Sequence, residues 1–207
     1  MKLSHIIPLL SVSALLLSGC GSTAQADPAP TLSVAPAQTS TPTPTTAATV
    51  AKTSRGNVQK KIGEVAMAGK SAADATMKFK VTSIEPITCD APYVTPPAGT
   101  ALAVAIEVET TPEFEGGLNV NGAPGLTSFD AHYWKGYAAN GTRMNKIDTA
   151  AAQNCLADQG RLLPSSLGKG EKASGVVILE VTSPTGTVAY DGAGAVNNGW
   201  EWAYPAK

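Results

Sequence analysis

Few side chains in this 207-residue chain could carry acid–base or metal chemistry. Two histidines and three cysteines leave little imidazole or thiolate for a catalytic or multi-ligand metal site. His132 lies well inside the chain, and no Gly-x-Ser-x-Gly segment accompanies it. A hydrolase would need His132 beside a serine and a carboxylate after folding. We therefore expect no catalytic residues and no cofactor, and we rank a hydrolase built on His132 as the third hypothesis.

Charged residues indicate neither a metal site nor a nucleic-acid partner. Glu107, Glu109, Glu113 and Glu115 lie close together, but they lack the alternating oxygen ligands and the glycine of a calcium loop. Alternation puts Glu107 and Glu109 on one strand face, where their charge keeps that face in water. Lys and Arg number 15 against 16 Asp and Glu, so no basic surplus is available to neutralise phosphates.

The first twenty residues have the features of an export signal. Lys2 precedes an apolar run over residues 6–17, shorter than the roughly 20 residues that a membrane-spanning helix needs. The run ends in Leu17-Ser18-Gly19-Cys20, which resembles the lipobox of bacterial lipoproteins. That resemblance implies removal of the signal peptide 1–19 and diacylation of Cys20, so that lipid anchors the chain at the extracytoplasmic face of the cell membrane. A secreted protein with a chance cysteine is the alternative.

Residues 20–55 form the predicted tether between the lipid and a folded domain. Ala, Pro, Ser and Thr dominate the segment after Cys20, and it contains no aromatic residue. Such a composition buries too little apolar surface to offset its ordering entropy, and the Thr-Pro repeats favour extended conformations. We expect a disordered spacer; an O-glycosylated stalk is the other interpretation.

Cys89 and Cys155 remain as a pair once Cys20 is acylated. An even number of cysteines in an exported domain indicates a disulfide. A redox or metal pair is the competing interpretation, but neither cysteine belongs to a Cys-x-x-Cys motif. The sequence therefore predicts a structural Cys89–Cys155 bond.

Residues 56–207 contain every tryptophan, tyrosine and phenylalanine of the chain and form the predicted domain. Apolar residues alternate over 77–81 and 101–110, which predicts half-buried strands. The β-branched stretch 175–182 is apolar on both faces and is interpreted as a central strand. Asn140-Gly141 predicts a hairpin turn, and residues 148–158 a short helix. Strands dominate, so we expect an all-β antiparallel sandwich.

Aromatic residues are the candidate ligand-binding side chains of this domain. Tyr133, Trp134 and Tyr137 could form an exposed platform for a sugar or for an apolar anchor of a partner; packing in the core is the alternative. Alternation puts Trp200, Trp202 and Tyr204 on one face of a terminal strand, where most of them belong to the interior.

The order of these features resembles a family of Gram-positive lipoproteins with an immunoglobulin-like extracellular domain of unknown function, which shares its fold with secreted immunoprotective-antigen proteins. The segments that carry the resemblance, in addition to the lipobox and tether, are Val81–Glu85, Ala101–Thr110, Phe129-Asp130, Tyr137–Thr142, Leu167–Glu171, Gly175–Val181 and Val188–Tyr190. The resemblance implies an immunoglobulin-like sandwich over about residues 58–205, displayed on the cell surface, and no catalytic residues.

The first functional hypothesis is a membrane-anchored, non-enzymatic binding module of the cell envelope. Its expected partners are the membrane, through the lipid, and an envelope protein or glycan. The second hypothesis is a structural or assembly factor of an envelope protein complex, and the third an envelope hydrolase. An exposed apolar patch would favour a protein partner, and a concave pocket would favour a small ligand.

Overall fold

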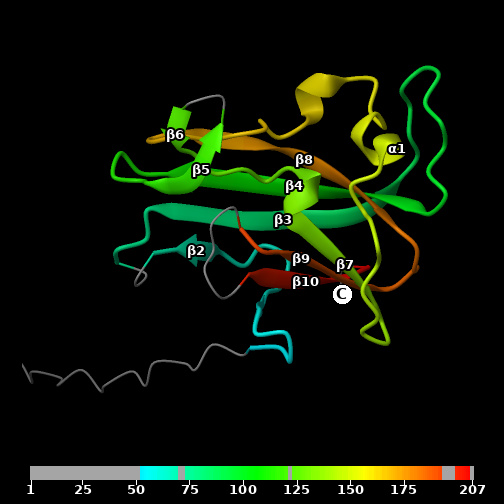
Figure 1. The fold of residues 1–207 in the computed structure, drawn as a ribbon, viewed down its shortest axis with the longest axis horizontal. Helices are drawn as coiled ribbons and strands as arrows, with labels where there is room; N and C mark the ends of the chain where they lie inside the picture. The colour runs from blue at the N-terminus through cyan, green and yellow to red at the C-terminus, as the bar shows by residue number, and fades with distance from the viewer. Residues whose placement is uncertain (1–51, 70–72, 121–122, 193–198, 206–207) are drawn as a thin grey trace, which may run out of the picture. The chain divides into compact units, whose positions relative to one another are not determined.

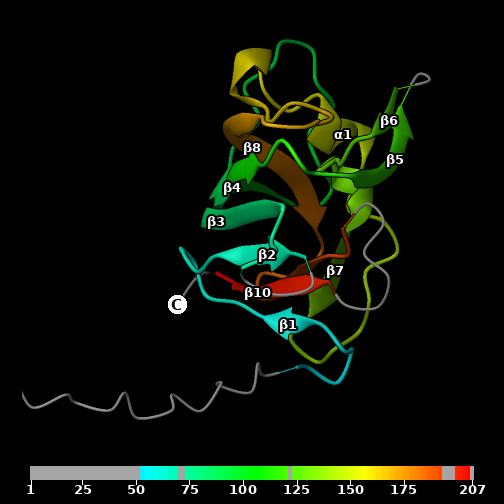
Figure 2. The ribbon, with the colours of Figure 1, turned by 90° about the vertical axis from the view of Figure 1, so that its left-hand side faces the viewer.

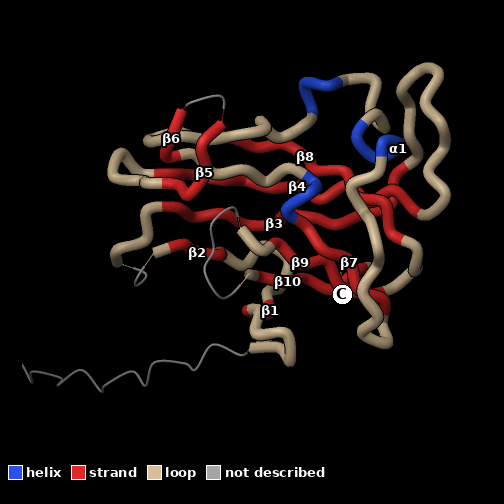
Figure 3. The backbone as a smooth tube through the Cα atoms, in the orientation of Figure 1, coloured by secondary structure: helices blue, strands red, loops and turns tan. Residues whose placement is uncertain are grey.

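The computed structural model describes residues 52–69, 73–120, 123–192 and 199–205. The signal peptide, Cys20 and the tether up to residue 51 lie outside these residues. Strands make up most of the regular structure, with a few short helical turns between them (Figure 3). In the described part, no helix has the length and apolar character needed to cross a bilayer.

Two four-stranded sheets form the body of the domain (Figure 1). The first sheet has the order β2-β3-β4-β8, with bounds Ala66–Ala68, Met77–Ile87, Thr100–Thr110 and Lys172–Val181. The second has the order β1-β10-β9-β7, with bounds Val58–Gln59, Trp200–Tyr204, Gly186–Tyr190 and Trp134–Ala138. A separate hairpin pairs β5 (Gly116–Val120) with β6 (Ala123–Gly125). Pairing is antiparallel except between β1 and β10.

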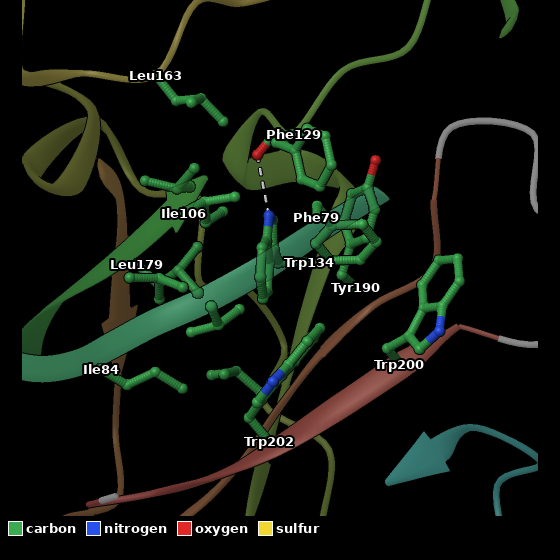
Figure 4. Close-up of a cluster of buried hydrophobic side chains, with 14 of the residues drawn as sticks. Phe79, Ile84, Ile106, Phe129, Trp134, Leu163, Leu179, Tyr190, Trp200 and Trp202 are labelled. Carbon is green, nitrogen blue, oxygen red and sulfur yellow. Dashed lines mark hydrogen bonds between the residues drawn. The ribbon is translucent and has the colours of Figure 1, made fainter. Parts of the chain in front are cut away.

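Aromatic side chains from both sheets fill the core between them (Figure 4). Phe79 of β3 meets the rings of Tyr190 on β9 and Trp200 on β10 edge-on, with centroid distances of 5.6 and 5.0 Å. Phe129 stacks on Tyr190 at 4.5 Å. Such offset and edge-to-face contacts stabilise the core beyond the area that they bury. The shared core confirms the predicted sandwich, and it includes the predicted interior residues Trp200, Trp202 and Tyr204.

A bulge in β3 keeps its apolar residues on the core face. Phe79 pairs with Val108 and Val81 with Ile106, but the register shifts between Val81 and Ser83, so that Ile84 pairs with Val104. One extra residue in a strand reverses the alternation beyond it. The strand predicted over 77–81 therefore extends to Ile87 with Ile84 still buried.

β8 is at the edge of its sheet, whereas the sequence predicted a central strand. Its free edge is covered by irregular chain: the N–H of Leu163 donates to the carbonyl of Val176, and the N–H of Glu180 donates to the carbonyl of Ile147. Covering an edge strand in this way blocks pairing with another chain. Both faces of β8 carry apolar residues because both faces are buried, and this does not require a neighbouring strand on each side.

The predicted turn and helix are both present. Gly141 has φ of 85°, and the N–H of Ala138 donates to the carbonyl of Thr142, which closes the hairpin. Helix α1 (Ala150–Gln153) lies within the predicted range. Its N-cap is Thr149, whose hydroxyl accepts a hydrogen bond from the N–H of Ala152.

Arg55 fastens the start of the domain to β10, although the sequence placed it at the end of the tether. Its Nε and Nη2 donate to the two carboxylate oxygens of Glu201 at 3.1 and 2.9 Å. Asn57 adds a third donor at 3.2 Å. Glu201 is 3% exposed, so these donors replace water around a buried charge. The contacts of the domain therefore begin before residue 56.

Candidate binding site

The three candidate aromatics do not form a common surface. Trp134 is 3% exposed and lies in the core, where its Nε1 donates to the carbonyl of Phe129 at 2.9 Å (Figure 4). The prediction of an exposed platform was therefore wrong for Trp134. The reason is its position on β7: Trp134 and Gly136 face the core, whereas Lys135 and Tyr137 point to the other face of the strand.

Tyr137 and Tyr133 are half-buried, and Tyr133 packs against the core. The Arg55 guanidinium lies 4.3 Å from the centroid of the Tyr137 ring, which is a cation–π contact. The ring of Tyr133 lies 3.8 Å from the exposed imidazole of His132. In a hydrolase triad the imidazole would contact a serine hydroxyl. In this structure the imidazole of His132 contacts the ring of Tyr133. Among the described residues, no group of three potential metal ligands is present.

Tyr93 is the most exposed large hydrophobic side chain that the structure describes. Its relative exposure is 105%, so its whole ring is in solvent. It lies on the loop of residues 88–99, which joins β3 to β4 and which we call the Tyr93 loop. The loop extends beyond the strands beside α1 (Figures 1 and 2). Tyr93 was not predicted from the sequence, because an exposed side chain in a loop belongs to no periodic pattern.

The backbone of Tyr93 is strained. Its φ of 62° is the one positive φ of a non-glycine residue in the described ranges. For an L-residue that conformation costs about 1–2 kcal/mol, and such strain persists only where the surrounding structure enforces it. The loop also contains three prolines, whose rings fix φ and restrict the residue before each of them. They are Pro92, Pro96 and Pro97, and they stiffen the backbone on both sides of Tyr93.

The first end of the Tyr93 loop is fastened to the chain after α1. A disulfide joins Cys89 to Cys155, which confirms the predicted bond. The N–H groups of Asp90 and Ala91 both donate to the carbonyl of Cys155, at 2.9 and 3.1 Å. The carboxylate of Asp90 accepts from the N–H of Ala157 at 2.8 Å. One covalent bond and three hydrogen bonds therefore fix this end.

Glu180 of β8 fastens the other end. One of its carboxylate oxygens accepts from the N–H of Gly99 at 2.8 Å, and the other accepts from the hydroxyl of Thr149, the N-cap of α1. Glu180 is 6% exposed, and its charge is compensated by these donors. A second apolar cluster supports both attachments on the outer face of β4 and β8; its buried members are Ala101, Ala103, Ala152, Cys155, Leu156 and Ile178.

A hollow of about 450 Å³ lies against the Tyr93 loop. Val94, Pro96 and Pro97 of the loop line it, together with Ile87 and Ala101 at the ends of the adjoining strands. The loop thus offers a projecting aromatic ring and a largely apolar recess. Together they form a candidate contact surface for a partner's apolar side chains.

A second open surface lies on the outer face of the sheet that contains β3, β4 and β8, over these three strands. Lys80 pairs with Glu107 at 2.8 Å, and Lys172 pairs with Glu109 at 3.1 Å. These pairs line a hollow of about 560 Å³ whose wall includes Val65. Exposed ion pairs of this kind contribute little stability. The predicted solvent-facing role of Glu107 and Glu109 is confirmed.

No family model matches this chain, and no curated protein matches its sequence. Among solved structures, a secreted protein of Mycobacterium tuberculosis, MPT63, is 17% identical with a TM-score of 0.46, over 70% of this chain and 97% of that chain. The protein ycdA of Bacillus subtilis, assigned as a lipoprotein, is 13% identical with a TM-score of 0.40, over 63% of this chain and 37% of its own. The yjhA protein of Bacillus subtilis is 17% identical with a TM-score of 0.39, over 63% of this chain and 79% of that chain. The immunoglobulin-like lipoprotein family stays a prediction from the sequence.

Proposed function

We propose that this chain is an extracytoplasmic lipoprotein, anchored through Cys20, whose sandwich is a non-enzymatic binding domain that contacts a protein partner through the Tyr93 loop. The lipobox-like segment supports the anchor, and the Cys89–Cys155 bond supports an oxidising compartment. The observation that carries the binding role is Tyr93, an exposed ring held at a positive φ by a loop fastened at both ends.

A protein partner fits this loop better than a glycan does. Near Tyr93 the loop carries prolines and Val94, and its single charged residue, Asp90, is hydrogen-bonded to Ala157. A rigid tyrosine beside an apolar recess matches the aromatic anchors that dominate protein interfaces, and little conformational entropy is lost on binding. The assembly-factor hypothesis also requires contact with a protein and not with a soluble ligand, so the same loop supports it.

A photo-crosslinker at position 93 tests the binding role in intact cells. The full chain would carry the photoreactive residue p-benzoylphenylalanine in place of Tyr93, and a matched variant would carry it in place of Met67, which is 39% exposed on β2. We expect one protein to be captured from position 93 and not from position 67, and Tyr93→Ala to abolish its co-purification. Capture of glycan alone from position 93, or equal capture from both positions, would refute the proposal.

The anchor has a separate test. Cys20→Ala removes the predicted acylation site, so the chain should stay unprocessed by the lipoprotein signal peptidase or leave the membrane fraction. Unchanged processing together with unchanged membrane retention would overturn the lipid anchor, whatever the result at position 93.

A further inference from the structure

The recess beside the Tyr93 loop adjoins a second hollow, which we call the inter-sheet hollow. Its volume is about 250 Å³, and Thr100, the first residue of β4, lines both it and the recess. The floor of the inter-sheet hollow is buried, because Ile84, Leu102 and Val181 are 2%, 3% and 1% exposed. Its rim is exposed and consists largely of prolines, which are Pro86, Pro184 and Pro205.

The two hollows lie on opposite faces of the sheet β2-β3-β4-β8. Ala101 lines the recess and belongs to the apolar cluster on the outer face, whereas Leu102 lines the inter-sheet hollow and belongs to the core. Because stacked sheets pack about 10 Å apart, the side-chain layers on the two faces of one sheet are also separated by about 10 Å. An extended chain spans that distance in about three residues. One segment that crosses the end of the sheet at Thr100 can therefore place a side chain in each hollow.

The backbone around Thr100 is fixed before any partner binds. The N–H of Gly99 donates to the carboxylate of Glu180 at 2.8 Å. Gly99 also lies so close to β8 that a Cβ at this position would be 2.3 Å from the carbonyl oxygen of Val181. The side chain of Thr100 is exposed on this fixed backbone. A site that is already formed loses little conformational entropy when a partner binds.

The linings restrict the partner to uncharged groups. None of the side chains that line either hollow is charged. A charged group that entered would therefore lose its hydration without compensation. Apolar side chains of a partner fit both hollows.

Main-chain donors beside the recess favour a peptide over a lipid acyl chain. Within the described part of the chain, the N–H groups of Tyr93, Val94, Thr95 and Ala98 donate to no acceptor. The backbone of a bound segment carries a carbonyl acceptor at every residue, whereas an acyl chain has no acceptors along its length. These N–H groups can therefore hydrogen-bond to a peptide.

We propose that the partner of the Tyr93 loop binds through one extended, uncharged segment that crosses the end of the sheet at Thr100. One apolar side chain of the segment occupies the recess, and a second occupies the inter-sheet hollow. This inference rests on the proposed function, and it specifies the chemistry of the partner.

Crosslinks from both hollows test whether one segment occupies them. In intact cells the full chain would carry p-benzoylphenylalanine in place of Tyr93 or in place of Pro184, on the rim of the inter-sheet hollow. Thr185 is the matched control position, because it is exposed in the same turn and lines neither hollow. Mass spectrometry of the crosslinked peptides identifies the attachment points. We expect attachments from positions 93 and 184 within one partner segment of about ten residues, about 33 Å when extended, with no charged residue between them, and none from position 185.

Two substitutions at the shared residue test the crossing point. Thr100→Trp adds a ring that blocks the crossing and should reduce capture from both positions at least about tenfold. Thr100→Val keeps the size of the side chain and should reduce neither. Residue 100 is exposed, so both variants should fold, which urea unfolding checks.

The outcomes separate this inference from the proposed function. Attachment of positions 93 and 184 to different segments, capture of only lipid or glycan from position 184, or no capture there would overturn the inference alone. Undiminished capture by folded Thr100→Trp would also overturn it. No capture from position 93 would refute the proposed function and this inference together.

Discussion

Replacing Arg55 with alanine tests how strongly the N-terminal segment stabilises the sandwich. The substitution removes both guanidinium hydrogen bonds from Glu201 and leaves Asn57 as the remaining side-chain donor to that carboxylate. The side chain of Glu201 is only 4% exposed, so water cannot replace the lost donors without a local opening of the structure. The variant also loses the contact of the guanidinium with the Tyr137 ring.

The unfolding free energy that Arg55→Ala should remove lies between two known limits. Removing one partner of a fully buried ion pair costs about 3–5 kcal/mol, and an exposed pair contributes about 0–1 kcal/mol. Arg55 is 28% exposed and Asn57 stays in place, which lowers the cost, whereas the cation–π contact adds about 0.5–1 kcal/mol. We expect Arg55→Ala to lower the unfolding free energy by about 2–4 kcal/mol. Adding Glu201→Gln removes the unpaired charge and should recover about 1–2 kcal/mol of that loss.

Urea unfolding at pH 7, followed by tryptophan fluorescence, measures these differences. Lys172→Ala is the matched control, because it breaks an ion pair of similar length whose partners are 73% and 54% exposed. It should change the unfolding free energy by less than about 1 kcal/mol. Two outcomes would contradict these expectations. One is that Arg55→Ala lowers the unfolding free energy no more than Lys172→Ala does. The other is that Glu201→Gln lowers the unfolding free energy as much in the Arg55→Ala background as it does alone.

Three further outcomes are expected. Replacing both Cys89 and Cys155 with serine opens a loop of 66 residues and should lower the unfolding free energy by about 4 kcal/mol in the same urea assay; a loss below about 1 kcal/mol would contradict this. Tyr93→Gly relieves the positive φ and should raise stability by up to about 1 kcal/mol, whereas a clear decrease would argue against backbone strain. Because burial raises the pKa of Tyr204, the unfolded chain loses this proton first, so stability should fall as the pH rises above about 10. Tyr204→Phe should lack that part of the fall, and parallel stability curves between pH 9 and 11 would refute it.

Alternation in the sequence predicted the strands well, but it did not predict their neighbours. The pattern at 77–81 identified β3, because one face of that strand is buried and the other is wet. The bulge after Val81 had no local signal, since its position depends on pairing with β4. The apolar run of β8 was correctly read as buried on both faces. Its place at the sheet edge depends on residues 147–163, which cover that edge. No periodic pattern in the sequence predicts the path of these residues.

The candidate site was less predictable than the fold. The sequence identified the Cys89–Cys155 pair, because an isolated pair of thiols in an exported domain has few other roles. It overvalued Trp134, because residue type alone does not say whether an aromatic ring packs inside or projects outward. Tyr93 could have been noticed only from the prolines around it, which mark a stiff loop but do not reveal its anchorage by Glu180.

The bond between Cys89 and Cys155 makes the shape of the contact surface depend on the compartment that the chain occupies. In a reducing cytoplasm the two thiols would stay apart, and the Tyr93 loop would keep only its hydrogen bonds. If the chain is exported as proposed, oxidation outside the cytoplasm would complete the attachment beside the recess. A partner that recognises the closed loop would then bind the oxidised chain in preference to the reduced one.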